Sequence, residues 1–289
     1  DSLSTCLGEI CGDGSLAEVD DHMRKESYSF KYTCTLERTY IDEERIPALI
    51  FHTDGAKKPL VICQHGFTGN KESMLTTCLM LADAGFVAVS IDAEKHGERK
   101  DPEILRRLSQ DPAQFFHILA GTVEDVRKVI DYVGENLDVD LKRVGMMGVS
   151  MGAIITLLAA TAEERLKAIV SVIGGANFQV LVRKSSLYKI GLETKLVEKF
   201  AQSAGELIGK YDPINNAHLF RSIPVLLLNG ERDDLIPLEC ASSLYEALKP
   251  HYQDAPDRLR MKVYKGIGHE YTSEMEKEAV EWLRRNIVQ

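Results

Sequence analysis

A serine between two glycines offers the clearest chemistry in the chain. The segment Gly148-Val149-Ser150-Met151-Gly152 lies between two apolar runs, Arg143–Met147 and Ala153–Ala160. A G-x-S-x-G pattern at a strand-to-helix junction is typical of a nucleophile elbow. Because a serine hydroxyl is a weak nucleophile, a sharp turn must expose it to a base, and glycines let that turn pass close to its neighbours. The pattern also occurs by chance, so its interpretation depends on partners elsewhere.

The first partner to find is a histidine base, and three of the eight histidines follow predicted core strands. In open α/β sheets, functional groups lie just past the C-terminal ends of the strands. His65, His96 and His269 satisfy that rule. Only His269 follows the last predicted strand, in a loop whose glycines, Gly266 and Gly268, allow it to turn back over the serine.

The second partner is a carboxylate that orients the histidine. The strand Val225–Leu228 is followed by a polar turn with two neighbouring candidates, Asp233 and Asp234, which composition does not separate. The resulting chain order of serine, aspartate and histidine is that of the α/β-hydrolases. The sequence therefore predicts a triad of Ser150, His269 and one of these two aspartates.

The elements that position these residues alternate between strands and helices. Short continuous apolar runs predict strands buried on both faces of a parallel sheet, at 60–63, 86–91, 143–147, 168–173, 224–228 and 259–264. Apolar residues at helical spacing predict helices over 74–82, 118–133, after Ser150, and over 275–287. This alternation predicts an α/β fold with a doubly wound, mostly parallel sheet covered by helices on both faces.

The two ends of this pattern are less regular. Tyr28–Thr39 alternates polar with apolar residues and predicts a half-exposed strand, with Arg45–His52 as its hairpin partner. We expect residues 1–27 to form an N-terminal arm and residues 28–289 to form one hydrolase domain. Gly174–Ser222 is longer than an ordinary crossover and holds two helical patterns, which favours a helical cap insertion over a long crossover packed on the sheet.

Composition excludes several classes of protein. A net charge of −9 with dispersed basic residues argues against nucleic acid as a partner, and no apolar run is long enough to span a membrane. The six cysteines show neither zinc spacing nor a disulfide framework, although Cys6 and Cys11 could pair. We therefore expect a cytoplasmic protein, while the start at Asp1 leaves a removed leader open.

Three stretches together resemble the α/β-hydrolase superfamily, most closely its bacterial esterases of the dienelactone hydrolase and prolyl oligopeptidase type. They are His65–Lys71 after a strand, Gly148–Gly152, and the G-x-x-D-x-x-x-P segment Gly230–Pro237 with the later Gly268-His269. The resemblance covers the chain from about residue 28. Aligned on the third motif, the acid of the family falls on Asp233, with Asp234 as the alternative.

The resemblance also implies an oxyanion hole made of two backbone N–H groups, which map to Phe67 and Met151. We expect His65 to shape this turn by hydrogen bonding rather than to act in catalysis. The turn His96-Gly97-Glu98-Arg99 resembles that of a small group of bacterial esterases. His96 and Arg99 could contact the substrate there, or Arg99 could pair with Glu94 or Glu98 and hold the loop.

These features predict a serine hydrolase, and they favour a carboxylesterase that cleaves small or medium acyl esters through an acyl-enzyme on Ser150. The sequence holds no motif for a cofactor or a metal, and its expected partner is a small-molecule ester. The oligomeric state stays open. The rival within enzymes is an aminopeptidase-like, amide- or thioester-cleaving hydrolase, although such peptidases commonly carry a large N-terminal domain. The rival from another class is a non-catalytic binding protein on the same fold, which would usually lack a triad member.

Overall fold

The computed structural model describes residues 33–43, 45–55, 57–111, 113–186, 211–221 and 223–288. Contacts divide the chain into two compact units, residues 1–33 and Cys34–Gln289. The fold described is that of the second unit. The predicted arm over 1–27, with Cys6 and Cys11, lies outside the described residues.

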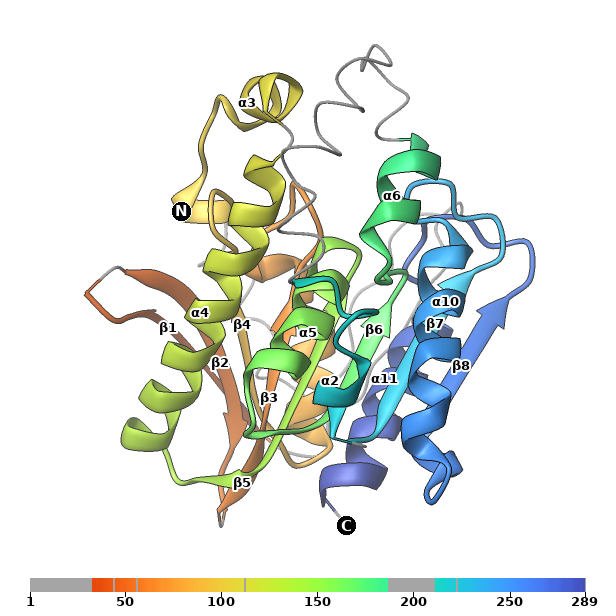
Figure 1. Cartoon of the computed structure of the whole chain (residues 1–289). Helices are drawn as coiled ribbons and strands as arrows, with labels where there is room; N and C mark the ends of the chain where they lie inside the picture. The colour runs from red at the N-terminus through yellow and green to blue at the C-terminus, as the bar shows by residue number, and fades with distance from the viewer. Residues whose placement is uncertain are drawn as a thin grey trace, which may run out of the picture. The chain divides into compact units, whose positions relative to one another are not determined.

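One sheet organises this unit, and its strands run in the order β1-β2-β4-β3-β5-β6-β7-β8 across the described residues (Figure 1). The strands are β1 Cys34–Ile41, β2 Ile46–Thr53, β3 Lys58–Gln64, β4 Val87–Ile91, β5 Val139–Val149, β6 Leu166–Val172, β7 Val225–Gly230 and β8 Leu259–Tyr264. β2 pairs antiparallel with both β1 and β4, and the remaining pairs are parallel. The prediction of a doubly wound, mostly parallel sheet is confirmed.

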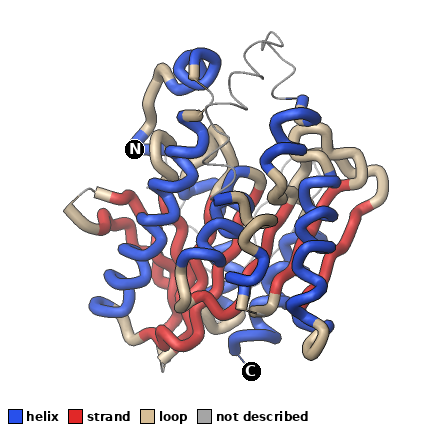
Figure 2. The backbone as a smooth tube through the Cα atoms, viewed as in Figure 1, coloured by secondary structure: helices blue, strands red, loops and turns tan. Residues whose placement is uncertain are grey.

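Helices cover both faces of the sheet, and Figure 2 shows how they alternate with the strands. They are α2 Leu75–Asp83, α3 Ile104–Gln110, α4 Gln114–Asn136, α5 Met151–Ala162, α6 Phe178–Lys184, α10 Leu238–Leu248 and α11 Ser273–Leu283. Short 3-10 helices lie at Lys71–Met74, Gly97–Arg99, Ala217–Phe220, Lys249–Tyr252 and Pro256–Arg258, and a π-helical turn lies at Arg284–Val288. The sequence analysis did not single out α3 or α10.

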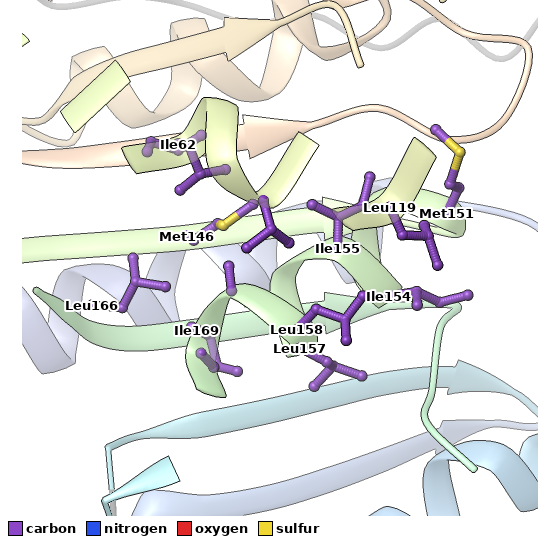
Figure 3. Close-up of a cluster of buried hydrophobic side chains, with 14 of the residues drawn as sticks. Ile62, Leu119, Met146, Met151, Ile154, Ile155, Leu157, Leu158, Leu166 and Ile169 are labelled. Carbon is purple, nitrogen blue, oxygen red and sulfur yellow. The ribbon is translucent and has the colours of Figure 1, made fainter. Parts of the chain in front are cut away.

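The buried apolar side chains form two clusters, one on each face of the sheet. In β3, Leu60 and Ile62 join the cluster under α4 and α5, while Val61 and Cys63 join the cluster under α2 and α11. Figure 3 shows the first cluster, in which the side chains of α5 pack over Met146 of β5. The central strands are therefore buried on both faces, as their continuous apolar runs predicted.

The α5 helix is the most deeply buried of the helices that position the site. The first ten of its twelve residues, Met151–Ala160, are all buried, so it packs between the sheet and its neighbours. An apolar helix with no solvated face needs cover on all sides. This close packing restricts the movement of the first turn of α5, where the serine motif lies.

Only the ends of the predicted cap insertion are described, because residues 187–210 lie outside the described part. The helix α6 lies near the start of this segment. The carboxylate of Asp212, after the gap, accepts hydrogen bonds from the N–H groups of Asn177 (2.9 Å) and Phe178 (2.6 Å). The two ends of the insertion are thus fastened to each other, and the helical cap stays a prediction.

Candidate active site

Ser150 occupies a strained turn between β5 and α5. Its backbone has φ 57° and ψ −116°, a conformation that L residues rarely adopt and that functional sites often hold. The N–H of Ser150 donates to Val172 O of β6 over 2.9 Å, which anchors the turn to the neighbouring strand.

The two motif glycines are required by close backbone approaches around this turn. A Cβ at Gly148 would lie 2.1 Å from the carbonyl oxygen of Gly152, and a Cβ at Gly152 would lie 2.1 Å from that of Gln64. Both contacts are far inside van der Waals distance and involve backbone atoms that cannot swing aside. The G-x-S-x-G spacing therefore has a steric cause in this fold.

The serine hydroxyl meets a histidine that comes from the other end of the chain. Ser150 Oγ lies 2.8 Å from Nε2 of His269, and Nδ1 of the same ring lies 2.8 Å from Oδ2 of Asp233. The side chain of His269 is 16% exposed and that of Asp233 is fully buried, so the ring links a solvent-accessible serine to a buried carboxylate. A buried carboxylate in this position fixes the ring orientation and stabilises a positive imidazolium.

The structure places Asp233, and not the exposed Asp234, against the histidine. The second carboxylate oxygen of Asp233 accepts from the N–H groups of Leu235 (3.0 Å) and Ile236 (2.8 Å), which hold the side chain inward. A Cβ at Gly230 would lie 2.3 Å from Gly268 O, so a glycine is needed where this turn crosses the histidine loop.

The turn His65–Gly69, which we call the oxyanion turn, lies directly beside Ser150. A Cβ at Gly66 would lie 3.4 Å from the Cβ of Ser150. The carbonyl oxygen of Gly66 is held by Nδ1 of His65 (2.8 Å) and by the N–H of Gly69 (3.1 Å). The carbonyl of Gly66 and the N–H of Phe67 belong to the same trans peptide and so point in opposite directions. The bonds that hold the carbonyl therefore also fix the direction of the Phe67 N–H.

His65 is built into this turn as a neutral ring. It is fully buried, and burial lowers its pKa to about 4. Its Nε2 accepts from the N–H of Ala93 over 3.0 Å, so the proton lies on Nδ1, which donates to Gly66 O. Both nitrogens are occupied by the backbone, as a residue that shapes the loop requires.

The resemblance implies the backbone N–H groups of Phe67 and Met151 as an oxyanion hole, and both flank the Ser150 turn. Within the described ranges, neither the N–H of Phe67 nor that of Met151 has a protein acceptor. Met151 opens α5, and the first N–H groups of a helix have no partner inside the helix. Such a pair of donors beside a nucleophile suits a developing negative charge on oxygen.

The turn His96–Arg99 after β4 does not contain the ion pair that we considered for Arg99. Arg99 pairs with neither Glu94 nor Glu98: its guanidinium lies 2.5 Å from Asp125 of α4 and 3.3 Å from the carbonyl oxygen of Asp92. Sequence reasoning missed Asp125 because it lies within a long amphipathic helix, where a carboxylate is usually solvated. Arg99 thus fastens the turn to α4.

His96 lies in the same turn and is 4% exposed. Its ring is 5.1 Å from that of Phe67, centroid to centroid, and meets it edge to face. The structure therefore brings His96 to the oxyanion turn and leaves Arg99 in an ion pair with the protein.

Lys71 is a second residue that the sequence analysis did not single out. It is 1% exposed, and its ammonium group lies 3.1 Å from Asp92 and 2.5 Å from Glu98. Asp92 also accepts from the backbone N–H of Lys71 over 2.8 Å. This buried ion cluster fixes the residues that follow the oxyanion turn. The sequence held one indication of this ion cluster, because Asp92 directly follows the apolar run of β4.

The described residues show neither a metal site nor a membrane span. No group of three or more His, Cys, Asp and Glu side chains in the ranges given above is arranged to hold a metal ion. Nor does any described helix combine the length and the apolar character needed to cross a membrane. Cys34, Cys63, Cys78 and Cys240 are free thiols, and Cys63 and Cys78 are buried as their apolar surroundings predicted.

The sheet, the strained serine turn and the Ser150–His269–Asp233 arrangement together define an α/β-hydrolase of the serine type. The sequence profile of the prolyl oligopeptidase family matches residues 116–287, which is more than half of the chain. The chain belongs to this family, in agreement with the resemblance noted from its motifs, and is a hydrolase.

Known proteins similar to the chain include a bacterial esterase and a putative one. It is 29% identical over 227 residues to the putative esterase YitV of Bacillus subtilis, an alignment that covers 78% of this chain and 88% of YitV. It is 26% identical over 245 residues to the esterase YjfP of Escherichia coli, covering 84% of this chain and 96% of YjfP. Among solved structures, TT1662 from Thermus thermophilus shares the fold with a TM-score of 0.68 at 23% identity, covering 89% of this chain and 99% of that one.

Proposed function

We propose that the protein is a carboxylesterase that cleaves small or medium acyl esters through an acyl-enzyme on Ser150. The observation that carries this proposal is the 2.8 Å contact between Ser150 Oγ and His269 Nε2 on a strained, accessible turn. A serine on such a turn with a base in contact is arranged for nucleophilic attack.

In the proposed reaction, His269 removes the hydroxyl proton as Ser150 attacks the ester carbonyl. Asp233 keeps the ring in place and stabilises the imidazolium that forms. The N–H groups of Phe67 and Met151 stabilise the negative charge on the carbonyl oxygen. His269 then gives the proton to the leaving alcohol, and water cleaves the acyl-enzyme by the same route.

One observation favours an ester over other acyl substrates. The similar proteins YitV and YjfP are described as a putative esterase and an esterase, and the alignments cover most of both chains.

An amide-cleaving activity is the second candidate, because the chain belongs to a family named for a peptidase. The same triad serves both reactions, since each passes through a tetrahedral intermediate and an acyl-enzyme. The two reactions differ in the leaving group. It is an alcohol for an ester and an amine, which is a poorer leaving group, for an amide.

The test compares both substrate classes on the wild-type chain and on two variants. We expect hydrolysis of p-nitrophenyl acetate and butyrate to exceed that of aminoacyl p-nitroanilides by at least about 100-fold. Ser150→Ala should lower ester turnover by about 10³-fold or more. Ser242→Ala, on α10, is the matched control and should keep wild-type turnover. Retained turnover in Ser150→Ala would refute the mechanism, and faster anilide cleavage would assign the peptidase reaction instead.

A further inference from the structure

His96 carries a buried nitrogen with no partner, beside the proposed oxyanion hole. Its Nδ1 lies 2.8 Å from the carbonyl oxygen of Glu94. Its Nε2 is shielded from solvent and has no hydrogen-bond partner in the described part of the chain. The ring centroid lies 5.1 Å from that of Phe67 and 5.6 Å from that of His65, both in the oxyanion turn.

The protonation state of this ring follows from its contacts. A carbonyl oxygen only accepts, so Nδ1 of His96 carries the proton that it shares with Glu94. Burial lowers the pKa of the ring, which keeps it neutral. Nε2 therefore presents a lone pair, and it is an acceptor that lacks a donor.

A buried acceptor without a donor is unfavourable and calls for a bound water or a ligand. The surroundings offer a water little support. Both nitrogens of the neighbouring His65 are already bonded to the backbone, and the ring of Phe67 occupies another side. A buried water usually needs two to four polar partners.

The same surroundings suit an aromatic or apolar group. Phe67 meets His96 at 72° and Phe115 of α4 at 68°, with ring centroids 6.2 Å apart in the second pair. The side chains of Phe67 and Phe115 are both partly exposed. A group bound along these two rings would find aromatic surface and, beside it, one hydrogen-bond acceptor.

We propose that His96 is a specificity-determining residue, whose Nε2 accepts a hydrogen bond from a hydroxyl on an aromatic group of the substrate lying against Phe67. The inference rests on the proposed esterase function and names its substrate class, esters whose acyl or alcohol part carries a hydroxyaryl group. His96 takes no part in bond breaking, and its effect is on which ester is held next to Ser150.

The test uses ester pairs that differ only in the hydroxyl. Methyl phenylacetate is compared with its 3- and 4-hydroxy derivatives for the acyl side, and 2-phenylethyl acetate with its ring-hydroxylated derivatives for the alcohol side. We expect wild-type kcat/KM to favour a hydroxylated member by about 10-fold in at least one series, because the site would otherwise leave its acceptor unpaired. The difference in kcat/KM between the hydroxylated and the unsubstituted ester should come mainly from KM.

Two substitutions separate the acceptor from the shape of the ring. His96→Phe removes the acceptor and should reduce the hydroxyl preference to about 1, whereas His96→Gln offers an amide oxygen and should keep part of it. His117→Phe, an exposed histidine on α4, is the matched control and should leave the preference at its wild-type value.

A measurement on the wild-type chain covers the case in which a variant fails to fold. With ¹⁵N-labelled histidine, the hydroxylated acid or alcohol product should shift the Nε2 resonance of His96, and the matching product without the hydroxyl should not. Ester hydrolysis without any hydroxyl preference, or a preference that survives His96→Phe, would overturn this inference and leave the esterase function standing. If no ester is hydrolysed, the proposed esterase function and the proposed role of His96 fail together.

Discussion

At the scale of single residues, the contacts decide between two neighbouring aspartates that the sequence left open. Asp233 is buried and touches the histidine, while Asp234 is exposed and offers its backbone oxygen to the N–H of Ser186 over 2.8 Å. Composition does not distinguish them, whereas the three-dimensional path of the turn after β7 brings only Asp233 to His269. Their assignment by family motif agrees with this geometry.

The two aspartates give a matched pair of substitutions. Asp233→Asn should lower kcat/KM for p-nitrophenyl butyrate by about 10³-fold or more, because an amide neither orients His269 in the right tautomer nor stabilises its positive charge. Asp234→Asn should change it by less than about threefold. Equal losses in both variants, or a larger loss in Asp234→Asn, would show that the acid is assigned wrongly.

His65 should make the stability of the protein depend on pH. Its pKa is lowered to about 4 in the folded protein because the ring is buried, against an ordinary value of about 6.5. Between these values the unfolded chain binds a proton that the folded chain does not. The stabilisation is therefore complete above about pH 6.5 and is lost as the pH falls toward 4, by about 3 kcal/mol in all.

Urea unfolding between pH 4 and pH 7.5 measures this effect when wild type is compared with His65→Gln. The variant lacks the titrating ring, so its deficit in free energy of unfolding should be largest at neutral pH and shrink as the pH falls. A deficit that stays constant across this range would contradict a buried, neutral His65.

At the scale of elements, the site depends on how closely α5 approaches the end of β3. Gly152→Ala would place a Cβ 2.1 Å from Gln64 O and 2.7 Å from His65 O, and these backbone atoms cannot move independently of the oxyanion turn. We expect a loss of stability of about 3 kcal/mol, from overpacking, and a fall in kcat larger than the change in KM.

Gly268→Ala is a suitable comparison for stability, because its Cβ would meet nothing closer than Arg232 O at 3.9 Å. Thermal unfolding of the two variants measures the difference. Equal melting temperatures for Gly152→Ala and wild type would mean that the elbow has more room than this packing allows.

Elements were predicted well where apolar periodicity is strong and poorly where polar residues interrupt it. The runs that became β3, β4 and β7 have no polar interior position other than Ser90, and their strands were expected within a few residues. In α10, only Cys240, Ala241, Leu244 and Leu248 are buried, and serines and glutamates lie between them. That pattern does not stand out without the neighbouring sheet.

At the scale of the whole molecule, the fold makes one site from three distant parts of the chain. Ser150 and His269 are 119 positions apart, and His269 and Asp233 are 36 apart. They meet because β5, β7 and β8 belong to one parallel array, whose C-terminal ends lie along the same edge. Applied to predicted strands, this rule selected His269 as the partner of the motif serine and narrowed the acid to Asp233 or Asp234.

The same rule could not find the contacts that support the site. The Arg99–Asp125 pair joins a loop to the middle of α4, and the ion pairs of Lys71 join the segment after the oxyanion turn to the turn after β4. Such partners are set by the packing of side chains in space, and no spacing along the chain encodes them. Strand order therefore located the reacting groups, and only the structure located the residues that hold them.

The most direct test of the central claim is active-site labelling with a fluorophosphonate, followed by mass spectrometry of the peptides. The arrangement predicts one adduct, on Ser150, formed rapidly in wild type and slowed by at least about 100-fold in His269→Ala. An adduct on another residue, no adduct at all, or an equal rate in His269→Ala would contradict a serine activated by His269.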